Sequence, residues 1–373
     1  MGSSSIWDVA IIGAGLAGVS AATVLARQGV RVVLVDPRET YPACFKAEKI
    51  EPDQAELFRK FGLLDGLLPL TGRVHEIIRA RGNRMLQPMR LEQYGIFYHD
   101  MVNGVRAQLP SSVTWKLDRV RNIALDPDIS RVTLMSGETL AARLVVLASG
   151  TGGNLHASLG IGKRMISEKH SFALGFNVAQ TDGTPFPFEA FTYYPEGFDK
   201  RVAFLTLFPI RNVMRANFFV YRLPGELWVR QFTKEPEKLL LESLPKLAQF
   251  IRPFRVTSRI EMSPVDLYQA EDHIHPGLVL LADAYQSVCP TTGTGVSKVL
   301  TDVDVMAECV PDWLATPGMG IEKIERFYRH PRKTVCDEQS LRGATYCRSL
   351  SMDSSLRWRF YREFMYLRCR LVA

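Results

Sequence analysis

A glycine-rich turn near the amino terminus has the residue types and spacing that bind a dinucleotide. It consists of Gly13, Ala14, Gly15, Leu16, Ala17 and Gly18. In such a GxGxxG turn the first glycine allows the tight bend, the second lets a pyrophosphate approach the backbone, and the third lets helix and strand pack closely. Asp36 follows where a carboxylate can accept hydrogen bonds from the adenosine ribose. The pattern predicts a site for the ADP half of NAD or FAD.

A second group of chemically suggestive residues lies near position 290. Asp283 ends a short apolar run, and Pro290, Gly293, Thr294 and Gly295 follow it. A carboxylate at a strand end can hold the hydroxyls of a sugar chain. A helix that begins near Gly295 can direct the positive end of its dipole toward a flavin ring. This second segment favours FAD over NAD.

The elements that must position these residues follow from the apolar pattern. Short apolar runs predict buried strands at residues 6–12, 31–35, 143–148 and 278–282. A helical pattern from Leu16 to Gln28 joins the first two, so the amino terminus is predicted to be a strand–helix–strand unit with a right-handed crossover. The third strand ends at Ser149 and Gly150. All the candidate cofactor residues therefore follow predicted strands.

Between about residues 171 and 262 the sequence changes to alternating, aromatic-rich segments that are typical of antiparallel strands. The strands predicted there are Phe172–Val178, Phe188–Tyr194, Val202–Phe208, Ala216–Tyr221 and Leu227–Arg230. A leucine-rich helix is predicted from Asp53 to Leu68. We therefore predict an α/β fold, with a Rossmann-type FAD-binding domain, an inserted, mostly antiparallel β-sheet substrate domain, and a C-terminal helical tail.

The predicted domain boundaries make the FAD-binding domain discontinuous. It takes residues 1–75, 96–170 and 273–320. The substrate-binding domain takes residues 76–95 and 171–272, and the helical region takes residues 321–373. A chain of 373 residues is long enough for both domains.

Composition and charge exclude several classes of function. The chain is 46% hydrophobic and 23% charged, as in an ordinary globular protein, and no apolar stretch approaches the length of a spanning helix. The net charge of +7 favours an anionic partner such as the FAD pyrophosphate, an acidic substrate or a carrier-bound thioester. The basic residues are spread along the chain, which argues against nucleic acid. The six cysteines have no paired or metal-binding spacing, so we expect reduced thiols, a cytoplasmic location and no metal site.

The tail holds the densest mixture of basic and aromatic residues. Arg357, Arg359, Arg362, Arg368 and Arg370 alternate with Trp358, Phe360, Tyr361, Phe364 and Tyr366. At about 100° per residue these arginines fall on at least two sides of a helix, whereas a membrane-surface helix would gather them on one face. We therefore expect a packed C-terminal helix and do not expect membrane contact.

The two motifs resemble those of the FAD-dependent monooxygenases of the para-hydroxybenzoate hydroxylase-like family, and the resemblance covers most of residues 6–310. It implies that Asp283 binds the ribityl chain of FAD and that the loop from Pro290 to Gly295 lies against the flavin ring. Lys46 or Lys49 stands where a flavin-side arginine is common, and Ala282 replaces the usual glycine before the aspartate. The family's central Asp-Gly motif becomes Ser149-Gly150, a version similar to that of related flavin halogenases and of geranylgeranyl-reductase-like proteins.

This resemblance implies a monooxygenase that hydroxylates or epoxidises a small aromatic or polyketide-like substrate through a flavin C4a-hydroperoxide, with molecular oxygen as co-substrate. NAD(P)H is the expected electron donor, and reduced flavin from a partner reductase is the alternative because the Asp-Gly motif has changed. A second hypothesis is a flavin halogenase, or a double-bond reductase or oxidase of the same superfamily. The halogenase signature Trp-x-Trp-x-Ile-Pro, however, is absent around Trp228. A non-enzymatic FAD-binding protein is a third. The sequence assigns no catalytic residue.

Overall fold

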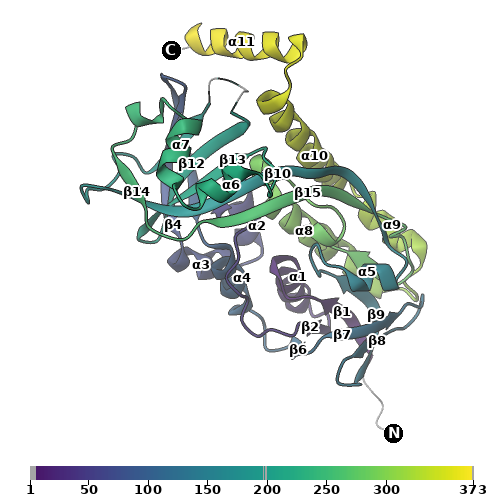
Figure 1. The fold of residues 1–373 in the computed structure, drawn as a ribbon. Coiled ribbons are helices and arrows are strands. Elements are labelled where there is room, and N and C mark those ends of the chain that lie inside the picture. Colours follow the sequence, from purple (N-terminus) through teal and green to yellow (C-terminus); the bar gives the residue numbers. More distant parts are fainter. Residues whose placement is uncertain (1–5, 196, 198–199, 372–373) are drawn as a thin grey trace.

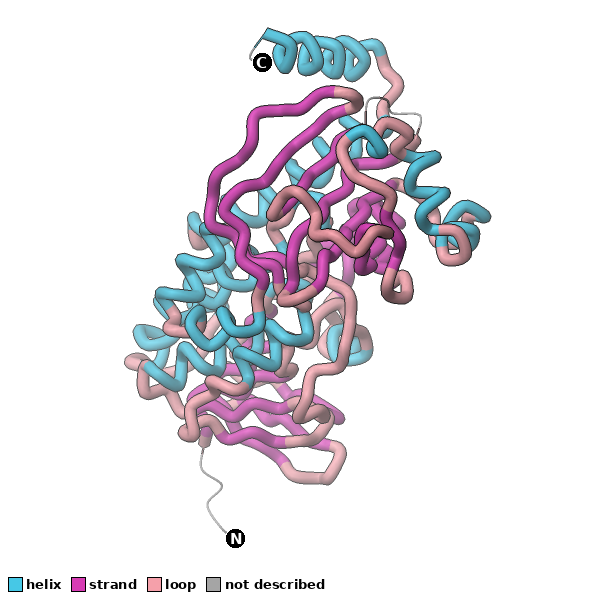
Figure 2. Tube along the Cα trace, turned by 90° about the vertical axis from the view of Figure 1, so that its left-hand side faces the viewer, coloured by secondary structure: helices cyan, strands magenta, loops and turns pink. Residues whose placement is uncertain are grey.

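The computed structural model contains two β-sheets, with helices around the first sheet and along the junction between them (Figures 1 and 2). It describes residues 6–195, 197 and 200–371. The chain forms an α/β sheet of the dinucleotide-binding type, a second, mostly antiparallel sheet, and a helical C-terminal region. The fold class predicted from the sequence is confirmed.

The first sheet is built around the amino-terminal strand β1 (Trp7–Ile12). This strand pairs in parallel with β2 (Val32–Val35) on one side and with β9 (Thr139–Leu147) on the other. The remaining strands are β6 (Thr114–Lys116) and β16 (Leu278–Leu280), which extend the parallel part, and β7 (Val120–Ala124) and β8 (Ser130–Leu134), which form an antiparallel hairpin on β9. All four residues of β2 are buried, which explains its continuous apolar run, because parallel strands are covered on both faces.

Two helices fix the carboxyl edge of this sheet. Helix α1 (Leu16–Arg27) connects β1 to β2 and packs against α8 (Gly295–Leu314). The carboxyl ends of parallel strands meet at one edge of a sheet. The segments that follow β1, β2, β9 and β16 therefore converge there, although they are far apart in the sequence.

The second sheet follows the order β14-β10-β13-β12-β11-β4-β5-β3, with β15 also paired to β10. Its strands are β3 (Lys49–Ile50), β4 (Gly72–Arg81), β5 (Arg84–Gly95), β10 (Gly162–Gln180), β11 (Ala190–Tyr194), β12 (Val202–Ile210), β13 (Val213–Val220), β14 (Phe254–Val256) and β15 (Glu261–Glu271). Among the strand pairs described in this second sheet, only β4–β11 is parallel. An aromatic core lies between this sheet and helices α6 (Leu227–Phe232) and α7 (Pro236–Ser243).

The structure corrects two local predictions. The segment Leu227–Arg230 was predicted as a strand but lies in α6, because Val229 and Phe232 turn together into the aromatic core, where Phe232 stacks on Phe218. The single helix predicted from Asp53 to Leu68 is interrupted. Helix α2 (Pro52–Lys60) ends just before Gly62, whose φ of +65° is left-handed, and the short helix α3 (Leu64–Leu67) follows.

The predicted helical tail is confirmed as α9 (Ile321–Tyr328), α10 (Pro331–Met352) and α11 (Leu356–Leu371). Helix α10 packs along α8 and against the 3-10 turn Pro290–Thr292. The tail therefore borders the loops at the carboxyl edge of the first sheet. None of the helices in the described part of the chain has the length and apolar character needed to cross a membrane.

Candidate flavin site

A cleft of about 450 Å³ lies at the carboxyl edge of the first sheet. Of the residues predicted from the sequence, those that line it are Gly13, Gly15, Leu16, Ala17, Asp36, Lys46, Ser149, Gly150 and Asp283. Residues that the sequence reasoning missed also line it, among them Arg38, Tyr41, Tyr98, Asp118, Arg119 and Thr151. The tertiary structure thus brings five separate predicted segments to one cavity.

Each of the three motif glycines occupies its position for a different geometric reason. Gly13 has a φ of +100°, and a Cβ there would lie 2.7 Å from the carbonyl oxygen of Ala148 on the neighbouring strand. At Gly18 a Cβ would lie only 1.8 Å from the carbonyl oxygen of Gly13. At Gly15 the nearest atom would be a ring carbon of Tyr41 at 4.0 Å, so this position faces open space in the cleft. Gly13 and Gly18 are required by packing, whereas Gly15 leaves room for a ligand at the start of α1.

Asp36 and Arg106 hold the glycine turn from two sides. One carboxylate oxygen of Asp36 accepts a hydrogen bond from the Ala14 amide at 2.8 Å, and the other accepts one from the Arg38 amide at 2.9 Å. The buried guanidinium of Arg106 donates to the carbonyl oxygens of Ala14, Arg38 and Glu39. Asp36 keeps further acceptor capacity toward the cleft. Nothing in the local sequence around Arg106 marked it for this role.

Ser149 contributes an unusual polar atom to the cleft. Its hydroxyl oxygen is buried and has no hydrogen-bond partner among the described residues. Gly150, which follows it, has a φ of +68°. Buried hydroxyls are nearly always hydrogen-bonded in native proteins, so this orphaned group is suited to a bound ligand.

Asp283 also lines the cleft, from the 3-10 turn Ala282–Ala284 that follows β16. Its carboxylate is 3.7 Å from the ammonium nitrogen of Lys46, and both side chains are partly exposed. The preceding residue, Ala282, has a φ of +51°, which explains why a glycine is usual at this position. The Ala282 amide donates to a carboxylate oxygen of Asp302 on α8 at 2.8 Å. This hydrogen bond holds the left-handed backbone that directs Asp283 into the cleft.

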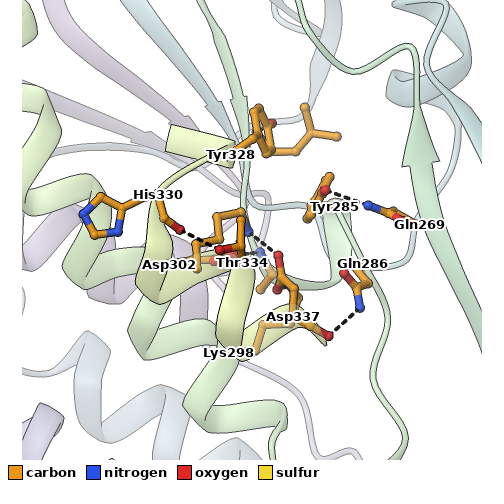
Figure 3. A network of polar contacts seen from close by, with 12 residues as sticks. Gln269, Tyr285, Gln286, Lys298, Asp302, Tyr328, His330, Thr334 and Asp337 are labelled. Carbon is orange, nitrogen blue, oxygen red and sulfur yellow. Dashed lines mark hydrogen bonds and ion pairs between the residues drawn. The ribbon is translucent and has the colours of Figure 1, made fainter. Parts of the chain in front are cut away.

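A buried charge network supports that hydrogen bond (Figure 3). Lys333 of α10 lies 2.8 Å from one oxygen of Asp302 and 3.2 Å from Asp337. Lys298 of α8 pairs with Asp337 as well, and the Lys333 ammonium lies 4.4 Å from the centre of the Tyr285 ring. Burial lowers the pKa of Lys333, but Asp302 and Asp337 outweigh it and raise that pKa above its ordinary value. The network joins the helical tail to the cofactor cleft.

The predicted flavin-ring loop lies beside the cleft rather than in its lining. Pro290 starts a 3-10 turn, Gly293 has a φ of +69°, and Thr294 precedes the first residue of α8, Gly295. The side chain of Gln54 donates to the Gly293 carbonyl at 3.0 Å and fixes the loop to α2. The contact of these residues with a flavin ring stays a prediction.

A second buried charge cluster lies between residues 45–48 and the second sheet. The Arg215 guanidinium donates to Glu48 at 2.7 Å and to Glu261 at 2.6 Å, and it lies against the rings of Phe45 and Phe97. Burial raises the pKa of Glu48 to about 7, although Arg215 opposes the shift. Because Arg215 is buried and paired on both sides, it does not offer a free charge to the phosphate of a nicotinamide cofactor.

Two residues near the cleft that could take part in chemistry, His156 and Cys289, are buried. Buried His156 bridges the carbonyl oxygens of Gly152 and Ala284 at 3.1 and 2.9 Å. Burial raises the pKa of the Cys289 thiol, which argues against a covalent flavin link through a thiolate. His273 and His275 belong to no cluster of potential metal ligands within the described residues.

These features fit FAD. Gly15 leaves the start of α1 open, as a pyrophosphate requires, and Asp36 lines the cleft with a carboxylate. Ser149 presents a buried hydroxyl that has no partner among the described residues. Residues 7–308 match the family described as the FAD binding domain. The chain belongs to this FAD-binding family. The cofactor predicted from the sequence is therefore confirmed as FAD for this flavoprotein, and so is the resemblance on which the prediction was based.

Curated relatives of the flavoprotein are hydroxylases. It is 23% identical over 337 residues to 3-demethoxyubiquinol 3-hydroxylase of Escherichia coli (strain K12), a match that covers 81% of this chain and 78% of the relative. It is 35% identical over 71 residues to 3-(3-hydroxy-phenyl)propionate/3-hydroxycinnamic acid hydroxylase of Mycolicibacterium smegmatis (strain ATCC 700084 / mc(2)155). This second match covers 19% of the chain and only 13% of the relative, which is a much longer protein.

Solved structures share the fold over nearly the whole chain. The p-nitrophenol 4-monooxygenase PnpA from Pseudomonas putida DLL-E4 superposes with a TM-score of 0.77 at 18% identity, covering 97% of this chain and 93% of PnpA. The flavin-dependent brominase Bmp2 superposes with a TM-score of 0.71 at 14% identity, covering 96% and 93%. At these identities the likeness shows the fold alone.

Proposed function

We propose that the flavoprotein is an FAD-dependent monooxygenase that hydroxylates a small aromatic substrate. The observation that carries the proposal is the single cleft in which the glycine turn, Ser149 and Asp283 meet, in a chain of the FAD-binding family. Relatives are named as hydroxylases of 3-(3-hydroxy-phenyl)propionate, 3-demethoxyubiquinol and aklavinone. When bound, FAD supplies the oxygen chemistry, and the protein supplies binding, orientation and electrostatics.

In this proposal, different residues of the cleft bind different parts of FAD. The start of α1 at Gly15 receives the pyrophosphate, because unpaired amide groups and the helix dipole favour negative charge there. Asp36 accepts hydrogen bonds from the ribose of the ADP half. Asp283 binds the hydroxyls of the ribityl chain, and Lys46 places a positive charge beside it.

We place the aromatic substrate beside residues 45–48, where Lys46 lines the cleft. Phe45 neighbours Lys46, which lines the cleft, and together with Phe97 it encloses the Arg215 guanidinium. These aromatic side chains supply apolar contact for a ring close to the flavin end of the cleft. The paired charges of Arg215 and Glu48 keep the polar part of this wall fixed, as orientation of a substrate requires.

Product analysis tests the assignment. The purified protein is incubated with phenolic candidates, a reductant and oxygen, and the products are identified by mass spectrometry. A gain of one oxygen atom supports hydroxylation. A gain of halogen in the presence of bromide or chloride supports the second candidate, a flavin halogenase, which is favoured by the fold of Bmp2 and of the halogenase PltM. A change of two hydrogens alone would assign the protein as a reductase or oxidase.

The electron donor is tested separately. We propose direct reduction by NAD(P)H, with Lys163 as a cation beside the Ser149 segment, since its ammonium donates to the Thr151 carbonyl at 2.7 Å. Turnover is compared with NADH, with NADPH, and with a flavin reductase added. Substrate-stimulated oxidation of a nicotinamide by the protein alone supports the proposal, and activity that requires the reductase replaces it with a two-component system.

A cytoplasmic location also remains a proposal. It is supported by the five cysteines that are unpaired in the described residues, since free thiols are typical of a reducing compartment. Fractionation of the producing cell, with the protein detected by antibody, tests this location.

A further inference from the structure

The last helix, α11, presents an exposed apolar stripe. Leu356, Phe360 and Phe364 follow one another at intervals of four residues, so they lie on one face of the helix. Their exposed fractions are 67%, 72% and 59%. Single exposed apolar side chains are ordinary on a protein surface, but a contiguous group marks an interaction site.

The position of α11 leaves this stripe open. The helix lies beyond the end of the second sheet, across the end of α10 and far from the first sheet (Figures 1 and 2). Its main packing partner among the described elements is α10. No described element covers Leu356, Phe360 or Phe364.

The opposite side of α11 is fixed to the protein. The ring of Trp358 lies 5.8 Å from that of Tyr346 on α10. Arg362 is buried and donates to the carbonyl oxygens of Leu350 and Asp353 at 3.0 and 2.6 Å. Because Trp358 and Arg362 follow the stripe residues by two positions, they lie about 200° around the helix from them. The packing therefore holds the stripe outward.

Positive charge flanks the stripe. Arg357 and Arg359 are exposed and make no ion pair with the described residues. Residues 356–371 contain five arginines and one glutamate, a net charge of +4. The sequence argued against membrane contact because the arginines fall on more than one side of the helix. In the structure Arg362 faces the protein and is hydrogen-bonded there, so it does not belong to the exposed charge of the helix.

We propose that α11 docks the flavoprotein on an anionic phospholipid surface. The stripe of Leu356, Phe360 and Phe364 enters the boundary between headgroups and acyl chains, and Arg357 and Arg359 contact lipid phosphates. Peripheral binding of this kind requires an apolar face and a basic component together, and α11 supplies both. The helix lies on the surface and does not span it. The inference goes beyond the proposed function and does not depend on the reaction.

Co-sedimentation with vesicles tests the docking helix. The FAD-bound full chain is mixed with vesicles of phosphatidylglycerol and phosphatidylcholine in equal parts, or of phosphatidylcholine alone. We expect binding to the anionic vesicles that weakens as salt is added, because the arginine contribution is screened. The triple variant Leu356→Ser, Phe360→Ser, Phe364→Ser should lose at least about tenfold in vesicle affinity. The double variant Arg357→Gln, Arg359→Gln should lose about tenfold on anionic vesicles only.

A matched control separates this face from general surface stickiness. Met135 is 61% exposed at the turn between β8 and β9, in the first sheet at the other end of the molecule. Met135→Ser should bind vesicles as the parent does. Flavin absorbance and the thermal midpoint are measured for every variant, and both should match those of the parent because all the substituted side chains are exposed.

Three results would overturn the proposal. Failure of the parent protein to sediment with anionic vesicles at low salt would refute the proposal directly. Equal vesicle binding by the triple variant would show that another surface carries the contact. Self-association of the parent without lipid, abolished in the triple variant, would assign the stripe to contact between copies of the chain. None of these results bears on whether the protein hydroxylates an aromatic substrate.

Discussion

Replacing Lys333 by methionine tests the buried network behind the Asp283 segment. The Lys333 side chain is fully buried, and its ammonium lies 2.8 Å from Asp302 and 3.2 Å from Asp337. Without it, the buried carboxylate of Asp302 loses its cation. Breaking a buried ion pair from one side costs about 3–5 kcal/mol. We expect a loss of that size in the free energy of unfolding, which is a large part of the roughly 5–15 kcal/mol available to a folded domain.

The same substitution should weaken FAD binding. Asp302 accepts the hydrogen bond from the Ala282 amide that holds the left-handed backbone before Asp283. An unpaired Asp302 carboxylate will shift toward water or take up a proton, and either change weakens that hydrogen bond. Loss of one hydrogen bond to a charged group, about 1.5–3 kcal/mol, corresponds to roughly ten- to a hundredfold in affinity. Urea unfolding of the apoprotein and titration of the apoprotein with FAD measure the two effects separately.

Two further variants make the result interpretable. Lys60→Met removes another lysine that pairs with α8, since the Lys60 ammonium lies 2.5 Å from Asp304. The Lys60 side chain is 59% exposed, so this substitution should lower the free energy of unfolding by only about 0–1 kcal/mol. Lys333→Arg keeps the charge and should recover part of the loss. Since the pKa of Lys333 is raised, its contribution is complete below the ordinary lysine pKa, and the loss should be equal at pH 6 and pH 9. A cost for Lys333→Met no larger than that for Lys60→Met would refute the reasoning.

Three other expectations follow from the site. Asp36→Ala should weaken FAD binding about ten- to a hundredfold, measured by fluorescence titration, because a charged hydrogen-bond acceptor for the ribose is lost; unchanged affinity would show that Asp36 does not contact the cofactor. Burial raises the pKa of Glu48 to about 7, so the folded state binds the Glu48 proton more tightly than the unfolded state does. The free energy of unfolding should therefore fall by about 3 kcal/mol as the pH rises from the unfolded pKa near 4.5 through 7. Glu48→Gln should lack this part of the pH slope in urea unfolding, and an identical slope would contradict the shift. Ala282→Gly should leave the free energy of unfolding unchanged or raise it by up to about 1 kcal/mol. Glycine relieves the left-handed strain at this position, but it also increases the entropy of the unfolded chain. A loss above about 1 kcal/mol would show that packing of the Ala282 methyl group stabilises the fold.

One of the two local errors in the sequence predictions has a tertiary cause, and the other has a local cause. Leu227–Arg230 has the apolar and aromatic residues of a strand, yet it forms part of α6. A helix places Val229 and Phe232 on one face, and both pack into the aromatic core beside the second sheet. The interruption of the Asp53–Leu68 helix depends on the left-handed backbone at Gly62, a signal present in the sequence as a glycine within a helical pattern. Local propensity is weak compared with packing, so such errors are expected where a segment meets a preformed core.

The sequence by itself determined the dinucleotide-binding unit and the cofactor. The positive φ of Gly13, the close approach of Gly18 to the Gly13 carbonyl, and the hydrogen bond from Ala14 to Asp36 all lie within residues 13–36. Their spacing can therefore be read without knowing the rest of the fold. Only the tertiary structure decided how distant side chains combine. Arg106 reaches back to the glycine turn, Lys333 reaches from the tail to Asp302, and Arg362 turns inward to leave an apolar stripe exposed. These contacts join residues whose separation along the chain carries no periodic signal, since burial and charge pairing are decided only when the elements pack.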